Sequence, residues 1–104
     1  MKKILIFFLT LFSINAYAST FMQTNVEIDR LGSHQGQVFY LNLKEPFKTD
    51  CAGGHLYCPS SNENCKNYYS LVLAAKVANK KLQEIDYTQD TVSKYCTVTL
   101  VQIN

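Results

Sequence analysis

The sequence lacks several features that would assign it to a common functional class. It has no clustered run of basic residues, no second long apolar run, and no recognisable catalytic motif around its two histidines, His34 and His55. Without a basic cluster there is no electrostatic reason to expect nucleic acid or an anionic membrane surface as a partner. Without a catalytic motif, the sequence predicts a protein that is not an enzyme. We also expect no cofactor and no metal.

The one long apolar run lies at the start of the chain. Lys2 and Lys3 precede an apolar segment over residues 4–14, which small residues follow up to Ala18. These are the three parts of a signal peptide. The run is shorter than the roughly 20 residues that a membrane-spanning helix needs, and no cysteine lies nearby to take a lipid, so we expect no membrane anchor. The sequence predicts a signal peptide over residues 1–18, cleavage at about Ala18, and one secreted or periplasmic domain over residues 19–104.

The predicted domain is small and electrically neutral. Without Lys2 and Lys3 the ten basic residues become eight, which equals the eight acidic residues. A domain of this size buries only about 60 to 65 % of the surface of its unfolded chain, so covalent crosslinks are expected.

All four cysteines lie in the predicted domain, where an oxidising compartment would pair them. Cys51, Cys58, Cys65 and Cys96 allow three pairings, which the sequence alone does not separate. We favour a local Cys58–Cys65 bridge and a long Cys51–Cys96 bridge. The alternative is a zinc site formed by three of these thiolates with His55, but export and the wide spacing between Cys58 and Cys65 disfavour it.

Hydrophobic periodicity predicts a mainly β domain with one helix. Alternating residues predict strands over 25–31 and 38–43, joined by a turn with glycines at 32 and 36, and Phe21 and Met22 extend the first strand. Residues 48–66 read as a cysteine-rich loop with room for one more short strand. Residues 67–79 predict a helix with Tyr68, Leu71, Ala75 and Ala78 on its core-facing stripe and Asn79 at its end.

Two further strands are predicted after the helix, over residues 82–88 and 95–103. Five strands with one helix between the third and the fourth describe a small OB-like barrel, here an α+β domain crosslinked by disulfides.

Tyrosine is the residue type that points to a binding surface, because its ring is apolar and its edge carries a hydroxyl. At alternating or helical positions core packing is the usual role, so we interpret Tyr40, Tyr68, Tyr87 and Tyr95 as structural. Tyr57 lies in the cysteine-rich loop beside His55. We predict these two residues, together with His34 and Gln35 in the turn between the first two strands, as ligand-binding residues.

The second half of the domain resembles a known family. An alanine- and lysine-containing helix, a short strand ending in tyrosine, and Lys94-Tyr95-Cys96 opening the last strand make residues 68–104 similar to the B subunits of bacterial A-B toxins. The aromatic strand Val38-Phe39-Tyr40, before a cysteine loop and a helix like Leu71 to Lys80, resembles small exported proteins related to subtilase-toxin B subunits. The chain departs from the toxin pattern in its cysteine arrangement and in having no tryptophan.

The resemblance implies an OB-fold and a function. It implies an exported protein that recognises a glycan or a protein receptor on a cell surface, as a homo-pentamer that carries a catalytic A subunit. The alternative is a monomeric periplasmic protein that binds or inhibits a partner protein. A third hypothesis, a small hydrolase, requires His34 or His55 to take part in catalysis.

Overall fold

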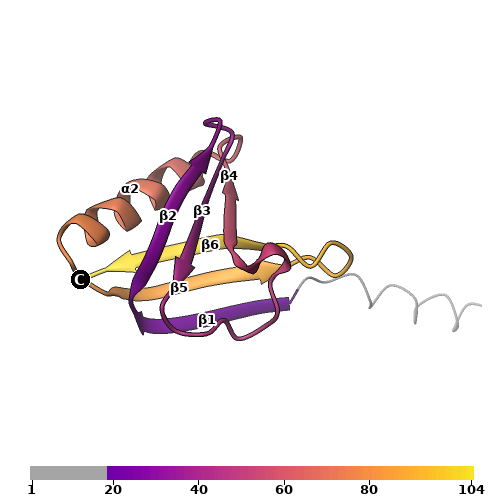
Figure 1. Ribbon diagram of the computed structural model, residues 1–104, viewed down its shortest axis with the longest axis horizontal. Coiled ribbons are helices and arrows are strands. Elements are labelled where there is room, and N and C mark those ends of the chain that lie inside the picture. The colour runs from indigo at the N-terminus through magenta and orange to yellow at the C-terminus, as the bar shows by residue number, and fades with distance from the viewer. Residues whose placement is uncertain (1–18) are drawn as a thin grey trace, which may run out of the picture.

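A computed structural model describes residues 19–104, and the predicted signal peptide lies outside them. The chain forms a twisted sheet with one long helix packed against it (Figure 1). The helix α2 spans Glu63–Val77, and a short 3-10 turn, η2, spans Ala52–Gly54. The strands are β1 (Ser19–Val26), β2 (Ile28–His34), β3 (Val38–Leu43), β4 (Leu56–Pro59), β5 (Leu82–Gln89) and β6 (Cys96–Ile103). Within these residues no helix is both long and apolar enough to cross a membrane.

The six strands form one sheet in the order β1-β5-β6-β4-β3-β2. All neighbours are antiparallel except β4 and β6, which run parallel. The mainly β class with one helix is confirmed. The expected five-stranded barrel is not what the structure describes, because the sheet has six strands and β1 does not pair with β2 to close it. The extra strand arises because the predicted first strand is divided in two.

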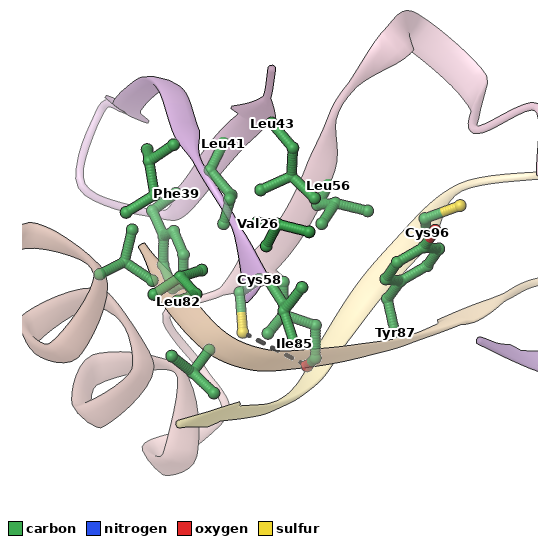
Figure 2. Packing of buried hydrophobic residues seen from close by; sticks show 14 of the residues in the cluster. Val26, Phe39, Leu41, Leu43, Leu56, Cys58, Leu82, Ile85, Tyr87 and Cys96 are labelled. Atoms are coloured by element: carbon green, nitrogen blue, oxygen red, sulfur yellow. Dashed lines mark hydrogen bonds between the residues drawn. The ribbon is translucent and has the colours of Figure 1, made fainter. Parts of the chain in front are cut away.

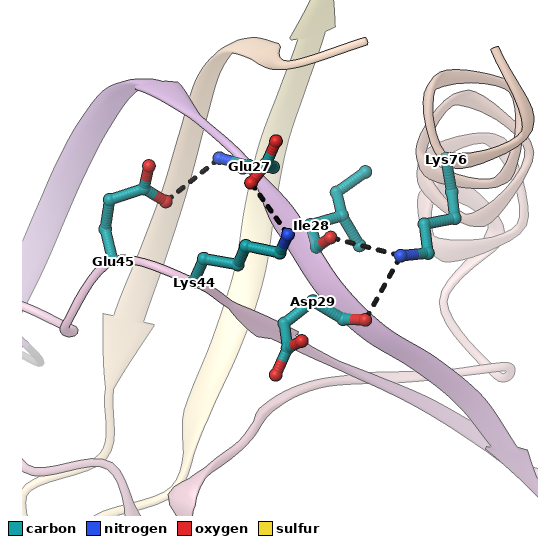
Figure 3. A network of polar contacts seen from close by, with 6 residues as sticks. All are labelled: Glu27, Ile28, Asp29, Lys44, Glu45 and Lys76. Carbon is teal, nitrogen blue, oxygen red and sulfur yellow. Dashed lines mark hydrogen bonds and ion pairs between the residues drawn. The ribbon is translucent and has the colours of Figure 1, made fainter. Parts of the chain in front are cut away.

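The division falls at Glu27, the single residue between β1 and β2. The left-handed backbone of Asn25, with a φ of 54°, turns the chain there. The Glu27 backbone N–H donates to the Glu45 carboxylate over 2.9 Å (Figure 3). The Glu27 carbonyl accepts from the Lys44 backbone N–H over 2.9 Å. The Lys44 ammonium also pairs with the Glu27 carboxylate at 3.0 Å and lowers its pKa below the usual value. These contacts hold the bend from the side of β3.

The helix holds the other side of the same bend. The Lys76 ammonium, near the end of α2, donates to the backbone carbonyls of Ile28 at 3.3 Å and Asp29 at 3.2 Å (Figure 3). Strand β2 is an edge strand, so one side of its backbone has no strand partner. Lys76 therefore ties the helix to the start of β2.

The core fills the space between the sheet and α2 (Figure 2). Alternation along β3 buries Phe39, Leu41 and Leu43 and leaves the residues between them half-exposed. The same face receives residues from every other strand and from the helix. The completely buried aliphatic side chains are Leu41, Leu56, Val72, Leu82 and Ile85, each with 0 % exposure.

The helix begins four residues earlier than predicted, because Asn62 caps it. The Asn62 side-chain oxygen accepts from the Asn64 backbone N–H over 3.0 Å. The buried residues of α2 are Cys65, Val72 and Ala75. The prediction that Ala78 faces the core is wrong, because the helix has ended at Val77 and Ala78 is exposed at the C-cap.

Two predictions for the end of the helix and its stripe are confirmed. Asn79 adopts the left-handed conformation expected after a helix, with a φ of 57°. Tyr68 and Leu71 are partly buried and pack against the core beside Ala75.

Both favoured disulfides are present. Cys51 bonds to Cys96 across 45 positions, and Cys58 bonds to Cys65 across seven. The predicted long loop over 48–66 is therefore ordered: it contains η2, β4 and the first turn of α2. With all four sulfurs in disulfides, the zinc alternative lacks its thiolate ligands.

Tyr87 is the largest side chain with no exposed surface, and its hydroxyl joins three segments. The hydroxyl donates to the Gln23 side-chain oxygen in β1 at 2.6 Å and accepts from the Lys48 backbone N–H at 2.9 Å. The ring stacks on Phe21 and meets the edge of Phe47, with centroid distances of 5.7 and 6.0 Å. Tyr87 thus closes the end of the core between β1 and the chain after β3, in the structural role that the sequence predicted.

The two disulfides should differ in their effect on stability. Replacing Cys51 and Cys96 together by alanine should lower the free energy of unfolding by about 4 kcal/mol, because the bridge closes a long loop. Replacing Cys58 and Cys65 should cost about 2 kcal/mol, since that loop is short. Urea unfolding of both double variants without reductant measures the difference, and equal losses would contradict the chain-entropy account.

Burial raises the pKa of the Tyr87 hydroxyl. A raised pKa in the folded state means that Tyr87 contributes stability fully below its ordinary pKa of about 10 and loses it as the pH rises further. Tyr87→Phe should cost about 1 to 3 kcal/mol at neutral pH, because Gln23 and Lys48 lose a partner. Unfolding measured from pH 7 to 11 should show a steeper decline for the wild type than for Tyr87→Phe; parallel declines would contradict this role.

Candidate functional site

A row of aligned residues crosses the outer face of the sheet, opposite the helix. The strand registers pair Gly32 with Tyr40, Tyr40 with Tyr57, and Tyr57 with Thr97. Residues that lie directly opposite each other on neighbouring strands point to the same face. Phe39 and Cys58, adjacent to the two tyrosines in sequence, are buried on the inner face. Tyr40 and Tyr57 therefore stand side by side on the outer surface.

Gly32 leaves the space that Tyr40 occupies. A Cβ atom at position 32 would lie 2.5 Å from both the Cζ and the hydroxyl oxygen of Tyr40. The Tyr40 ring thus lies across strand β2. Any side chain at position 32 would displace it.

Four aromatic side chains follow one another on this face, and we call them the aromatic platform: Tyr40, His55, Tyr57 and Tyr95. Ring centroids are 5.0 Å apart between Tyr40 and His55, 5.9 Å between His55 and Tyr57, and 5.3 Å between Tyr57 and Tyr95. The last two pairs are edge-to-face. Three of the rings are half-buried, and Tyr95 is 51 % exposed. The platform is therefore packed and remains open to solvent.

Asn42 determines how His55 is oriented. The Asn42 amide nitrogen donates to the Gly54 carbonyl at 2.8 Å, so its amide oxygen is the atom that faces Nδ1 of His55, with which it forms a hydrogen bond. An amide oxygen is only an acceptor, so Nδ1 carries the proton. In neutral His55, Nε2 is then a free acceptor.

A second glycine accommodates Tyr57. Gly53, in η2, has a φ of 74°, and a Cβ atom there would lie 2.5 Å from the Tyr57 hydroxyl. The preceding residue, Ala52, donates its N–H to the Lys94 carbonyl at 2.9 Å. The Cys51–Cys96 disulfide joins the same two segments, one residue before Ala52 and two residues after Lys94. The η2 turn and the segment of Tyr95 are therefore fixed to each other.

The loop that presents Tyr95 has its own anchor. The Asp90 carboxylate accepts from the backbone N–H groups of Ser93 at 2.7 Å and Val92 at 3.1 Å, which lowers the pKa of Asp90. The Asp90 N–H donates to the Tyr95 carbonyl at 3.0 Å. The loop is thus a closed turn, which positions Tyr95 beside Tyr57.

The structure brings together two of the four predicted site residues. Tyr57 and His55 both belong to the platform. His34 is the last residue of β2 and Gln35 begins the turn to β3; both are exposed and lie beyond the aligned row, and no aromatic contact joins them to it. The four predicted residues therefore do not form one site.

Sequence reasoning missed Tyr40 and Tyr95, which it had interpreted as structural. The signal for Tyr40 was present: if Phe39, Leu41 and Leu43 share the inner face, Tyr40 must point outward. Tyr68 packs against the core and also forms a surface hydrogen bond, because its hydroxyl donates to the Thr99 carbonyl at 2.6 Å.

The platform offers chemistry for stacking and hydrogen bonding without charge. Its rings present apolar faces, and its hydroxyls and the Nε2 atom of His55 offer polar atoms at their edges. No family model, no curated protein and no solved structure matches the chain, so the site is interpreted from its own geometry.

The assignment of the His55 proton can be tested directly. Nitrogen-15 NMR of the neutral side chain should show a protonated Nδ1 and an unprotonated Nε2. Asn42→Leu should remove this preference, because Nδ1 then loses its acceptor, while His34 serves as an internal control whose spectrum should not change. A protonated Nε2 in the wild type would contradict the orientation of Asn42.

Proposed function

We propose that the protein is an exported, non-enzymatic binding protein that recognises a glycan through the aromatic platform. The observation that carries this proposal is the placement of four aromatic side chains on an exposed sheet face, where they contribute nothing to the buried core. Two glycines leave room for the tyrosines of this face, and a disulfide joins its loops. A surface arranged in this way suits a ligand with flat apolar faces and many hydroxyls.

The architecture supports the same proposal. If β1 and β2 are taken as two halves of one bent strand, the strand order, the parallel β4–β6 pair and the helix between β4 and β5 follow the OB design. In that design the second and third strands and the loop between the last two form the ligand-binding surface. Here these are β3 with Tyr40, β4 with Tyr57 and the loop that ends at Tyr95.

The neutral character of the platform favours a sugar with no charge at the point of contact. Stacking of a sugar ring on Tyr57 and Tyr40 would bury apolar C–H groups, and His55 Nε2 would accept a hydrogen bond from a hydroxyl. A buried aromatic residue at the centre of a binding surface commonly contributes more than 1 kcal/mol, and about 1.4 kcal/mol corresponds to a tenfold change in affinity.

We propose further that the protein acts as an oligomer, a pentamer by its resemblance to toxin B subunits, which could carry a catalytic subunit. The free edge of β1 supports self-association, because its sequence STFMQTNV contains no charged residue and no proline to prevent pairing. Light scattering of the oxidised protein tests this part. A monomer would leave the alternative, a monomeric periplasmic protein that binds a partner protein.

The platform is tested by a glycan-array screen followed by titration of any sugar that binds. Tyr57→Ala and Tyr40→Ala should each weaken binding by about tenfold or more. Val92→Ala is the matched control, because Val92 is 88 % exposed at the tip of the neighbouring loop and does not belong to the platform. Binding that survives both tyrosine substitutions, or an array with no binding, would exclude this function for the platform.

A further inference from the structure

A groove of about 360 Å³ lies on the helix side of the sheet, apart from the platform. It separates the turn between β2 and β3 from the first half of α2. Its lining combines two aromatic residues with hydroxyls and one cation: Phe39, Tyr69, Ser33, Ser60, Ser70 and Lys66. Phe39 and Tyr40 are consecutive residues of β3 and point to opposite faces, so the groove and the platform are separate surfaces.

The walls of the groove are held in place. Phe39 and Tyr69 meet edge to face, with their ring centroids 5.1 Å apart. Ser60 donates from both its N–H and its hydroxyl to the Gln37 carbonyl, each at 2.8 Å, which ties the turn after β4 to the turn before β3. The Cys58–Cys65 disulfide closes the same turn onto the helix. The cavity is therefore formed by the fold before any ligand arrives.

Two of the serine hydroxyls in the groove, those of Ser60 and Ser70, are set to accept hydrogen bonds. The Ser60 hydroxyl donates to the Gln37 carbonyl, and the Ser70 hydroxyl donates to the Lys66 carbonyl at 3.1 Å. The oxygen of each still has a free lone pair. Such oxygens suit a ligand that carries hydroxyl donors.

The charge in the groove comes from the side chain of Lys66. Among residues 19–104 the only ion pair within 4.0 Å joins Lys44 to Glu27, so no carboxylate neutralises Lys66, including Glu63 one turn earlier. Two N–H groups of the first helical turn already have partners: the Asn62 side-chain oxygen accepts from Asn64, and the Asn62 carbonyl accepts from Cys65. An anion in the groove would therefore be held by the Lys66 ammonium.

We propose that this groove binds a single sugar ring that carries an anionic group, either a carboxylate or a sulfate. The anionic group pairs with Lys66, the ring lies against Tyr69 and Phe39, and the ring hydroxyls donate to Ser60 and Ser70. The volume is at the lower end of the range for small-molecule sites, which fits one ring. This site does not depend on the platform. The protein would bind a charged sugar in the groove and a neutral sugar on the platform.

The test is an NMR titration of the oxidised exported protein with three probes: glucuronate, N-acetylglucosamine 6-sulfate and neutral N-acetylglucosamine. We expect one or both anionic sugars to shift the amide signals of Ser60, Lys66 and Tyr69, with binding at least about tenfold tighter than that of the neutral sugar. Binding should weaken as salt rises, because it depends on one partly exposed charge. The tighter of the two anionic probes identifies the anionic group.

Substitutions separate this site from the platform. Lys66→Gln should weaken binding of the anionic sugar by about tenfold. Lys80→Gln, which removes an exposed lysine beyond the end of α2, should leave this affinity unchanged. Tyr57→Ala should leave the groove unaffected, so failure of the platform and failure of the groove are distinguishable. Equal affinity for charged and neutral sugars, shifts confined to other residues, no shifts at all, or unchanged binding in Lys66→Gln would each overturn the proposal.

Discussion

The bend at Glu27 is the constraint on which the rest of the structure depends. Because one residue separates β1 from β2, the two outermost strands of the sheet are joined covalently, although no hydrogen bonds pair them. The sheet must therefore curve until its two edges meet at that point. Curvature gives it an inner face that α2 can fill and an outer face that spreads its side chains toward solvent. Lys44, which follows β3, and Lys76, in α2, both contact the chain at this corner.

A covalent constraint at the other end of the sheet completes the outer face. The platform residues come from three segments that are distant in sequence: β3, the chain from η2 into β4, and the loop before β6. The Cys51–Cys96 bond and the Ala52–Lys94 hydrogen bond join the last two of these, and the β3–β4 register aligns Tyr40 with Tyr57. Each ring is thus positioned by backbone geometry, and not by the ligand that it would bind.

Local patterns predicted those features that depend on neighbouring residues. The strand over 38–43 has the predicted bounds, Asn79 has the expected conformation, and the two favoured disulfides are the ones present. The division of the first strand was not predictable from alternation, because Val26 and Ile28 are both buried whether they belong to one strand or to two. The pairing of β4 with β6 was missed because β4 has only four residues inside a segment that reads as a loop. For the candidate site, Tyr57 and His55 were predicted from their loop, and alternation along β3 already indicated that Tyr40 points outward. The place of Tyr95 beside Tyr57 required the tertiary structure.

The position of β6 has a consequence for the order in which the chain can fold. It is the last strand along the described chain, yet it lies at the centre of the sheet, between β5 and β4. Before it arrives, the chain can form only two separate fragments, β1 with β5 and β2 with β3 and β4, and Cys51 has no partner. Cooperative folding of the described domain must therefore wait until β6 is available.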